Sequence, residues 1–215
     1  PLFVLGSLLL ALLSTAQVGL VVETKVYQRP GVGPYVDVNM ALLGGTMVLK
    51  ANERGFVQPK VEVLTLVEQG GTIKAFAKTL VLGQERTDTL ATDVVHRESF
   101  ELAPGSYALS IEIRDQNNGD TTATRYDAPL SVGELPPGLD ISEVLLAERI
   151  ERSEEGRTGK YGYDPVPLLS DYYPSSIRSL EFYAEVYNSD RYFGKDSAYL
   201  LTYQIESYEK RQVVG

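Results

Sequence analysis

The chain has 215 residues, of which 43% are hydrophobic and 23% charged, a composition typical of a folded globular protein. Its 29 acidic residues outnumber the 20 basic ones, and the formal net charge of -9 would repel a polyanion such as a nucleic acid. The chain has no cysteine, which excludes disulfide bonds, thiolate nucleophiles and cysteine metal sites. We therefore expect a hydrophobic core unsupported by cross-links of sulfur, and no nucleic-acid partner.

The chain begins with an uncharged apolar run. Residues 2–13 read LFVLGSLLLALL, and Ser14-Thr15-Ala16 follows with the small-x-small pattern that a signal peptidase cuts. The run is shorter than the roughly 20 residues needed to cross a bilayer. We predict that residues 1–16 are a signal peptide and that the protein has no stable membrane span. Its destination would be the periplasm, the outer-membrane surface or the extracellular space.

Residues 17–134 are dominated by alternation of apolar and polar side chains, which predicts β-strands with one face on a core. Residues 61–67 are apolar on both sides near their middle, as expected of a central strand. Glycine-rich and proline-rich turns separate the runs at short intervals, for example at Gly44-Gly45 and Gly70-Gly71. This spacing predicts an all-β fold, with an immunoglobulin-like β-sandwich over residues 17–134.

The most specific local pattern in this region is LAPGSY at residues 102–107, followed by Leu109, Ile111 and Ile113 in alternation. In immunoglobulin-like domains a tyrosine near the start of the penultimate strand ties the preceding corner through its hydroxyl group. We expect Tyr107 to have this role.

Residues 135–139 contain Pro136-Pro137, which neither a helix nor a central strand accommodates, and we interpret them as a linker. Residues 140–215 would form a second β-sandwich domain. Within it, residues 141–155 contain good helix formers after Ser142, a residue suited to capping a helix, yet the alternation from Val144 to Ile150 favours a strand.

Two further runs of this second domain alternate clearly, over residues 180–187 and 199–206. We expect them to pair as a hairpin through residues 188–197. The sequence ends at Gly215, before a seven-stranded sandwich would be complete, so we expect this domain to be truncated at its C-terminus.

Several segments together resemble a known group of exported proteins. These are the apolar N-terminal segment, residues 31–38 (GVGPYVDV), residues 162–167 (GYDPVP) and residues 180–188 (LEFYAEVYN). They resemble the N-terminal region of GWxTD-domain proteins of Bacteroidota. The tryptophan-containing motif that names the family is absent here, because the chain has no tryptophan. The resemblance implies an envelope or secreted protein with tandem immunoglobulin-like domains, and it assigns no catalytic residue.

Reactive constellations are scarce in the sequence. His96 is the only histidine, so histidine-based triads and two-histidine metal sites are excluded. Asp115, Asn117 and Asp120 are a candidate calcium-binding turn, although the twelfth position of the would-be loop is Tyr126 instead of glutamate. A plain Asn-Gly hairpin turn explains the same residues. We predict no cofactor, no firm metal site and no enzymatic activity.

Tyrosine is the most distinctive feature, since ten of the 14 tyrosines follow Asp140. Exposed tyrosines suit protein or sugar recognition, because each ring offers apolar area and a polar tip. The candidate binding residues are Tyr163, Tyr172, Tyr173, Tyr183 and Tyr187. The leading hypothesis is a non-enzymatic interaction module that contacts a protein partner or a C-terminal domain of its own chain. The alternatives are a carbohydrate-binding module and an accessory region of an enzyme.

Overall fold

The computed structural model describes residues 17–29, 31–119, 122–153, 160, 162–170, 178–194, 196 and 198–206. Nearly all the regular structure in these ranges is antiparallel β-strand, which confirms the all-β fold class. The predicted signal peptide, residues 1–16, lies outside the described residues and stays a prediction. No helix in these ranges is long and apolar enough to cross a membrane.

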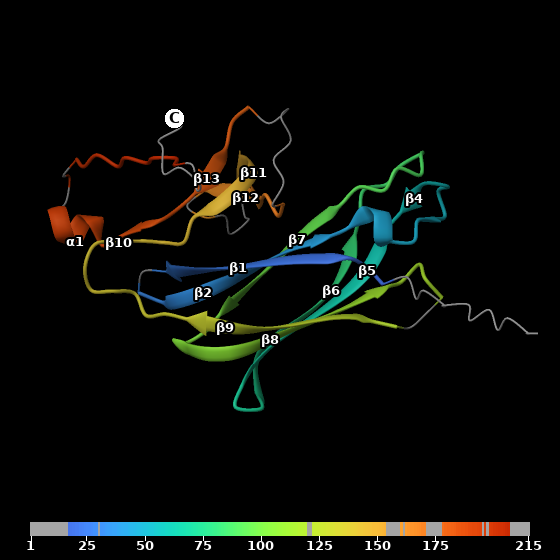
Figure 1. Cartoon of the computed structure of the whole chain (residues 1–215), viewed down its shortest axis with the longest axis horizontal. Helices are drawn as coiled ribbons and strands as arrows, with labels where there is room; N and C mark the ends of the chain where they lie inside the picture. Colours follow the sequence, from blue (N-terminus) through green and yellow to red (C-terminus); the bar gives the residue numbers. More distant parts are fainter. Residues whose placement is uncertain are drawn as a thin grey trace, which may run out of the picture.

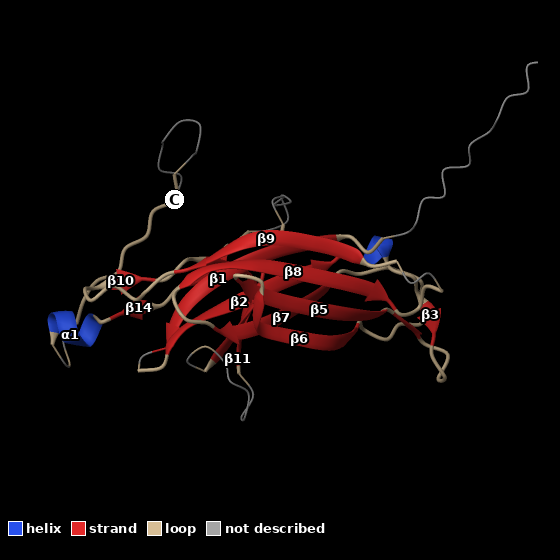
Figure 2. Ribbon diagram, turned by 90° about the horizontal axis from the view of Figure 1, so that it is seen from below, coloured by secondary structure: helices blue, strands red, loops and turns tan. Residues whose placement is uncertain are grey.

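The first unit is a sandwich of two antiparallel sheets (Figures 1 and 2). One sheet has the order β1-β2-β7 and the other the order β6-β5-β8-β9. The long strands are β1 (Leu20–Arg29), β2 (Gly33–Leu42), β5 (Lys60–Gln69), β6 (Thr72–Leu82), β7 (Val94–Glu101), β8 (Gly105–Asp115) and β9 (Thr124–Val132). A short 3-10 helix (Gly44–Thr46) and the small pair β3 (Lys50–Ala51) and β4 (Val57–Gln58) lie between β2 and β5.

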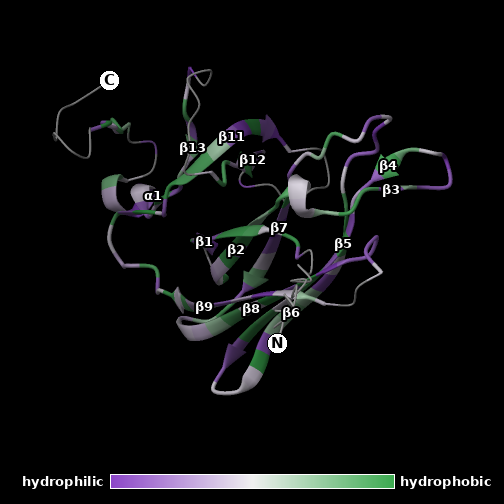
Figure 3. Cartoon of the chain, turned by 45° about the vertical axis from the view of Figure 1, so that its right-hand side comes forward, coloured by the Kyte–Doolittle hydropathy of each residue, from purple (hydrophilic) through white to green (hydrophobic). Residues whose placement is uncertain are grey.

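Alternation along the strands builds the core between these sheets. Val36 and Val38 of β2 and Val61 and Val63 of β5 belong to one core cluster, and all four side chains are fully or almost fully buried. The colouring in Figure 3 shows apolar stretches along strands of both sheets. The central-strand prediction for residues 61–67 is confirmed, because β5 pairs with β6 on one side and β8 on the other.

The predicted tyrosine corner is also confirmed. Tyr107, near the start of β8, is buried, and its hydroxyl donates a hydrogen bond of 2.7 Å to the carbonyl oxygen of Ala103. This contact closes the corner between β7 and β8 and fixes where β8 enters the sheet.

Replacing Tyr107 by phenylalanine removes this hydrogen bond and leaves the Ala103 carbonyl without its donor. We expect the free energy of unfolding of the first sandwich to fall by about 1 kcal/mol. Urea denaturation measures this change. Tyr126→Phe is the matched control, because the Tyr126 ring packs at the edge of the same core. An equal effect of both substitutions would contradict the assigned role of Tyr107.

The second unit consists of two small sheets, ordered β12-β11-β13 and β10-β14. Its elements are β10 (Asp140–Ile141), β11 (Leu145–Arg152), β12 (Tyr163–Pro167), β13 (Glu181–Tyr183), β14 (Val186–Tyr187) and α1 (Ser189–Phe193). Residues 145–152 are therefore a strand, as the alternation favoured. Ser142 caps no helix, and its hydroxyl instead accepts a hydrogen bond from the backbone N–H of Glu185.

The predicted hairpin between residues 180–187 and 199–206 is wrong. The first run divides at Ala184 and Glu185, so β13 pairs with β11 while β14 pairs with β10. No continuous strand edge is then left for pairing, and residues 198–205 form no strand. The Tyr203 ring still packs edge-on against Phe182, at 5.5 Å between centroids. The described part of the second unit is thus two small sheets and not a complete sandwich.

Candidate functional site

The two units meet at a buried cluster of tyrosines, carboxylates and one lysine. Figures 1 and 3 show the second unit lying over the side of the first sandwich that carries β1, β2 and β7. We call the group of residues at this contact the junction cluster. Its members are Tyr27 of β1, Tyr35 and Asp37 of β2, Lys160, Tyr183 of β13, Tyr187 of β14, and Glu185, which lies between β13 and β14.

Alternation along β2 explains how the first unit contributes to the cluster. Val36 and Val38 point into the core, so Tyr35 and Asp37 point to the opposite face of the sheet. Tyr35 lies directly opposite Tyr27 in the register of β1 and β2, and the two rings stack at 5.5 Å between centroids. Because the second unit covers this face, Asp37 is only 2% exposed.

Lys160 is the only cation inside the cluster as defined, and three rings surround its amine. Its Nζ lies 3.1 Å from the Tyr27 ring centroid, 4.8 Å from that of Tyr35 and 5.4 Å from that of Tyr183. Cations are attracted to the faces of aromatic rings, and more strongly where water is excluded. The same Nζ forms an ion pair of 2.9 Å with Asp37 Oδ2 and donates a hydrogen bond of 3.0 Å to the Tyr35 hydroxyl. The amine is therefore held from several directions.

Glu185 organises the side of the cluster that comes from the second unit. Its carboxylate accepts hydrogen bonds of 2.7 Å from the hydroxyls of both Tyr183 and Tyr187. The Tyr187 hydroxyl in turn accepts a bond of 3.0 Å from the backbone N–H of Gln28 in β1. A chain of hydrogen bonds thus runs from the first sandwich through Tyr187 to Glu185.

Burial and charge shift the ionisation of these groups. Desolvation, with the added repulsion of Glu185 and Asp37, raises the pKa of Tyr27 and Tyr35 well above the ordinary value for tyrosine. Desolvation and the nearby Glu185 carboxylate do the same for Tyr183 and Tyr187. Burial lowers the pKa of Lys160, and the attraction of Asp37 offsets only part of this effect. The four tyrosines therefore stay neutral over the physiological pH range, and Tyr35, Tyr183 and Tyr187 keep the hydroxyl protons that they donate to Glu185.

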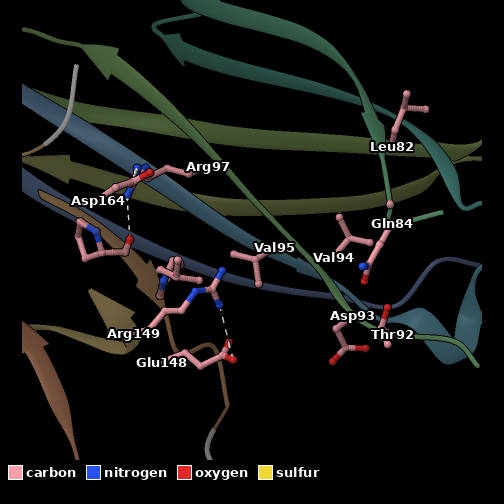
Figure 4. A pocket seen from close by; sticks show the side chains of 14 residues that line it. Leu82, Gln84, Thr92, Asp93, Val94, Val95, Arg97, Glu148, Arg149 and Asp164 are labelled. Atoms are coloured by element: carbon pink, nitrogen blue, oxygen red, sulfur yellow. Dashed lines mark hydrogen bonds and ion pairs between the residues drawn. The ribbon is translucent and has the colours of Figure 1, made fainter. Parts of the chain in front are cut away.

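Three further contacts, made by Glu143 and Arg97, tie the units together outside the cluster. The backbone N–H of Val26 donates to Glu143 Oε2 at 2.8 Å. Arg97 of β7 donates to the carbonyl oxygen of Pro165 at 3.1 Å and forms an ion pair with Asp164. Beside Arg97 a groove of about 530 Å³ runs between β7 and β12, and Figure 4 shows its lining. Charged side chains of both signs line this groove, which gives it no single preferred ligand charge.

The structure brings together only some of the predicted binding residues. Tyr183 and Tyr187 meet at Glu185, with their hydroxyls turned to the first sandwich and away from solvent. Tyr163 lies on β12 outside the cluster and is 45% exposed. Tyr172 and Tyr173 lie outside the described residues, and whether any of the five binds a partner stays a prediction.

Sequence reasoning missed the partners of these tyrosines, namely Tyr27, Tyr35, Asp37, Lys160 and Glu185. A signal for most of them was present. Tyr35-x-Asp37 and Tyr183-x-Glu185-x-Tyr187 place tyrosine and carboxylate on one face of each strand, so two similar faces were available to meet. Nothing in the pattern around Lys160 distinguished it from the other charges of its segment.

The candidate metal residues have structural contacts instead. Asp115 accepts hydrogen bonds from the backbone N–H groups of Val48 and Asn117, and the Asn117 amide donates to the carbonyl oxygens of Val48 and Gln58. Asp120 lies outside the described residues. In the part of the chain that the structure describes, no group of three acidic or histidine side chains could hold a metal ion. His96 lies on the edge strand β7 beside Glu98, at 3.2 Å.

Comparisons with known proteins found no matching family model, no matching curated protein and no matching solved structure. The assignment of function therefore depends on the geometry of the junction cluster and on the surface around it.

The raised tyrosine pKa values predict alkaline opening of the junction. In the opened or unfolded chain these tyrosines ionise near their ordinary pKa of 10.0, whereas in the folded chain they stay neutral. Their contribution is complete below pH 10 and is lost as the pH rises above it. The lowered pKa of Lys160 acts with the opposite sign, but one lysine opposes four tyrosines.

Urea denaturation at a series of pH values, together with tyrosinate absorbance, measures this effect. We expect stability to fall above about pH 10 and four tyrosines to ionise only as the junction opens. The variant Tyr183→Phe/Tyr187→Phe should show a shallower alkaline loss. Simultaneous ionisation of every tyrosine in the folded protein, with no loss of stability, would contradict the prediction.

Proposed function

We propose that the chain is a non-enzymatic scaffold and interaction module of an exported protein, in which the junction cluster holds two β-units in one fixed orientation. The observation that carries this proposal is the closure of the cluster. Lys160, Asp37 and Glu185 are each at most 8% exposed, and each is engaged by the others or by tyrosine hydroxyls. A substrate has no access to these groups, so their concentration supports a structural role.

The surface that supports interaction with a partner lies on the second unit. Leu200, Leu201 and Tyr203 are 87%, 57% and 75% exposed, and Tyr192 is 66% exposed. Large apolar side chains exposed at neighbouring positions of the chain, as at residues 200–203, support a contact with another protein. Aromatic residues such as tyrosine are enriched at the centres of protein interfaces. We infer that the partner is a protein with a complementary apolar surface.

The glycan-binding alternative receives less support. It required the faces of Tyr183 and Tyr187 to be open for stacking on sugar rings, yet Tyr187 is 5% exposed and the Tyr183 ring packs edge-on against Tyr27. Of the candidate residues within the described ranges, Tyr163 is the most exposed, at 45%. A single ring is a small platform for a saccharide.

The fixed orientation is testable by removing the hydroxyl groups of Tyr183 and Tyr187, which donate hydrogen bonds to Glu185. Tyr183→Phe/Tyr187→Phe removes the two shortest hydrogen bonds of this buried carboxylate and leaves it only the longer one from Tyr35. We expect the junction to lose about 3 kcal/mol. NMR relaxation of backbone amides should show the two units tumbling as one body in the native protein and more independently in the variant. Tyr192→Phe/Tyr203→Phe, at exposed positions, is the matched control and should tumble like the native protein. Independent tumbling of the native units would disprove the proposal.

The interaction surface is testable separately with a photo-cross-linking amino acid in cells that export the protein. We expect a defined protein adduct from position 200 or 203. The control is position 32, where Val32 is 63% exposed at a turn of the first sandwich. Equal adducts from all three positions, or none from positions 200 and 203, would count against this surface.

A further inference from the structure

Lys160 and Asp37 hold an amine and a carboxyl group in direct contact inside the junction cluster. Lys160 Nζ lies 2.9 Å from Asp37 Oδ2, and the side chains of the two residues are 7% and 2% exposed. An amine and a carboxyl group at this distance, shielded from bulk water, are the two reactants of an amide. Holding them in contact replaces a bimolecular encounter by a unimolecular step.

We propose that Lys160 and Asp37 condense to an intramolecular isopeptide bond that covalently joins β2 of the first sandwich to the second unit. The new bond links Lys160 Nζ to Asp37 Cγ. The bond from Cγ to Oδ2 breaks, and one water molecule leaves. Unlike a disulfide, this cross-link needs neither an oxidant nor cysteine, which the chain lacks.

The first requirement of the reaction is a neutral amine and a protonated carboxyl group. Transfer of one proton from the Lys160 ammonium to the Asp37 carboxylate produces both at once. Burial penalises the charged amine and so brings its neutral form within reach. The lowered pKa of Lys160 has the same physical cause.

The second requirement is stabilisation of the tetrahedral intermediate, and the surroundings of Asp37 meet it. The Ser99 hydroxyl donates a hydrogen bond of 2.6 Å to Asp37 Oδ1, the oxygen on which negative charge develops when the amine attacks Cγ. Oδ2, on the side of Lys160, is then the oxygen that leaves as water. The two carboxyl oxygens therefore have different partners that match their different fates.

The third requirement is a route for the proton that the amine loses after its attack. The Tyr35 hydroxyl accepts a hydrogen bond from Lys160 Nζ and lies 3.4 Å from Glu185 Oε1. The proton can pass along this contact to the Glu185 carboxylate and return to the departing Oδ2 to complete the water. The Tyr27 ring, 3.1 Å from Nζ, limits the positions open to the amine and keeps it beside Asp37.

Mass spectrometry of the purified protein under denaturing conditions tests the proposal directly. We expect the mass of the native protein to be lower than that of its sequence by one water molecule. Tryptic digestion should give a single branched peptide that contains both Asp37 and Lys160. Lys160→Arg and Asp37→Ala should have the full masses of their sequences, because neither can form the amide.

Asp37→Asn is the discriminating variant. The same attack on an asparagine side chain expels ammonia, so this protein should lose the mass of ammonia instead of water. A native protein of full sequence mass, with Asp37 and Lys160 on separate tryptic peptides, would overturn the proposal whether or not the variants fold. That result would leave the non-covalent junction of the proposed function intact, since the relaxation experiment on the tyrosine variants tests it independently.

Discussion

The arrangement of the two units depends on the constraint that a charge removed from water must be given a compensating partner. Lys160, Asp37 and Glu185 are all buried at the contact between the units. An unpaired charge in such a place would cost several kcal/mol, so the position of each unit is fixed by the need to keep these groups matched. A small rotation of the second unit would separate Lys160 from Asp37 and Tyr187 from Gln28. The contact therefore fixes the orientation of the two units more strictly than an apolar contact of similar size would.

This constraint also explains the unusual burial of β2. Its apolar face contributes Val36 and Val38 to the sandwich core, and its polar face carries Tyr35 and Asp37 under the second unit. A strand of an isolated sandwich would expose that second face to water. In this protein the second unit covers the part of the outer face that carries Tyr35 and Asp37, and these polar side chains pair with the second unit instead of with water alone.

The sequence predicted the first unit well because each of its features is local. Alternation identified β5 as a central strand, and the pattern before Tyr107 identified the corner that its hydroxyl closes. The junction cluster was predicted only in part. Tyr183 and Tyr187 were chosen as recognition residues, but Glu185, which lies between them, determines where they point. The contact of Lys160 with Asp37 spans more than a hundred residues, and no periodic pattern records a pairing over that separation.

The hydrogen bonds of Glu185 explain why the predicted hairpin of the second unit does not form. Alternation over residues 180–187 is regular, and local propensity alone would continue the strand. Glu185, which lies between β13 and β14, however accepts hydrogen bonds from the hydroxyls of Tyr183 and Tyr187, and its backbone N–H donates to the Ser142 hydroxyl. Meeting these demands moves the chain from one sheet to another between β13 and β14, because a carboxylate buried without donors would cost more than the ladder bonds that are lost. The polar chemistry of the junction thus overrides the strand propensity of the segment that supplies it.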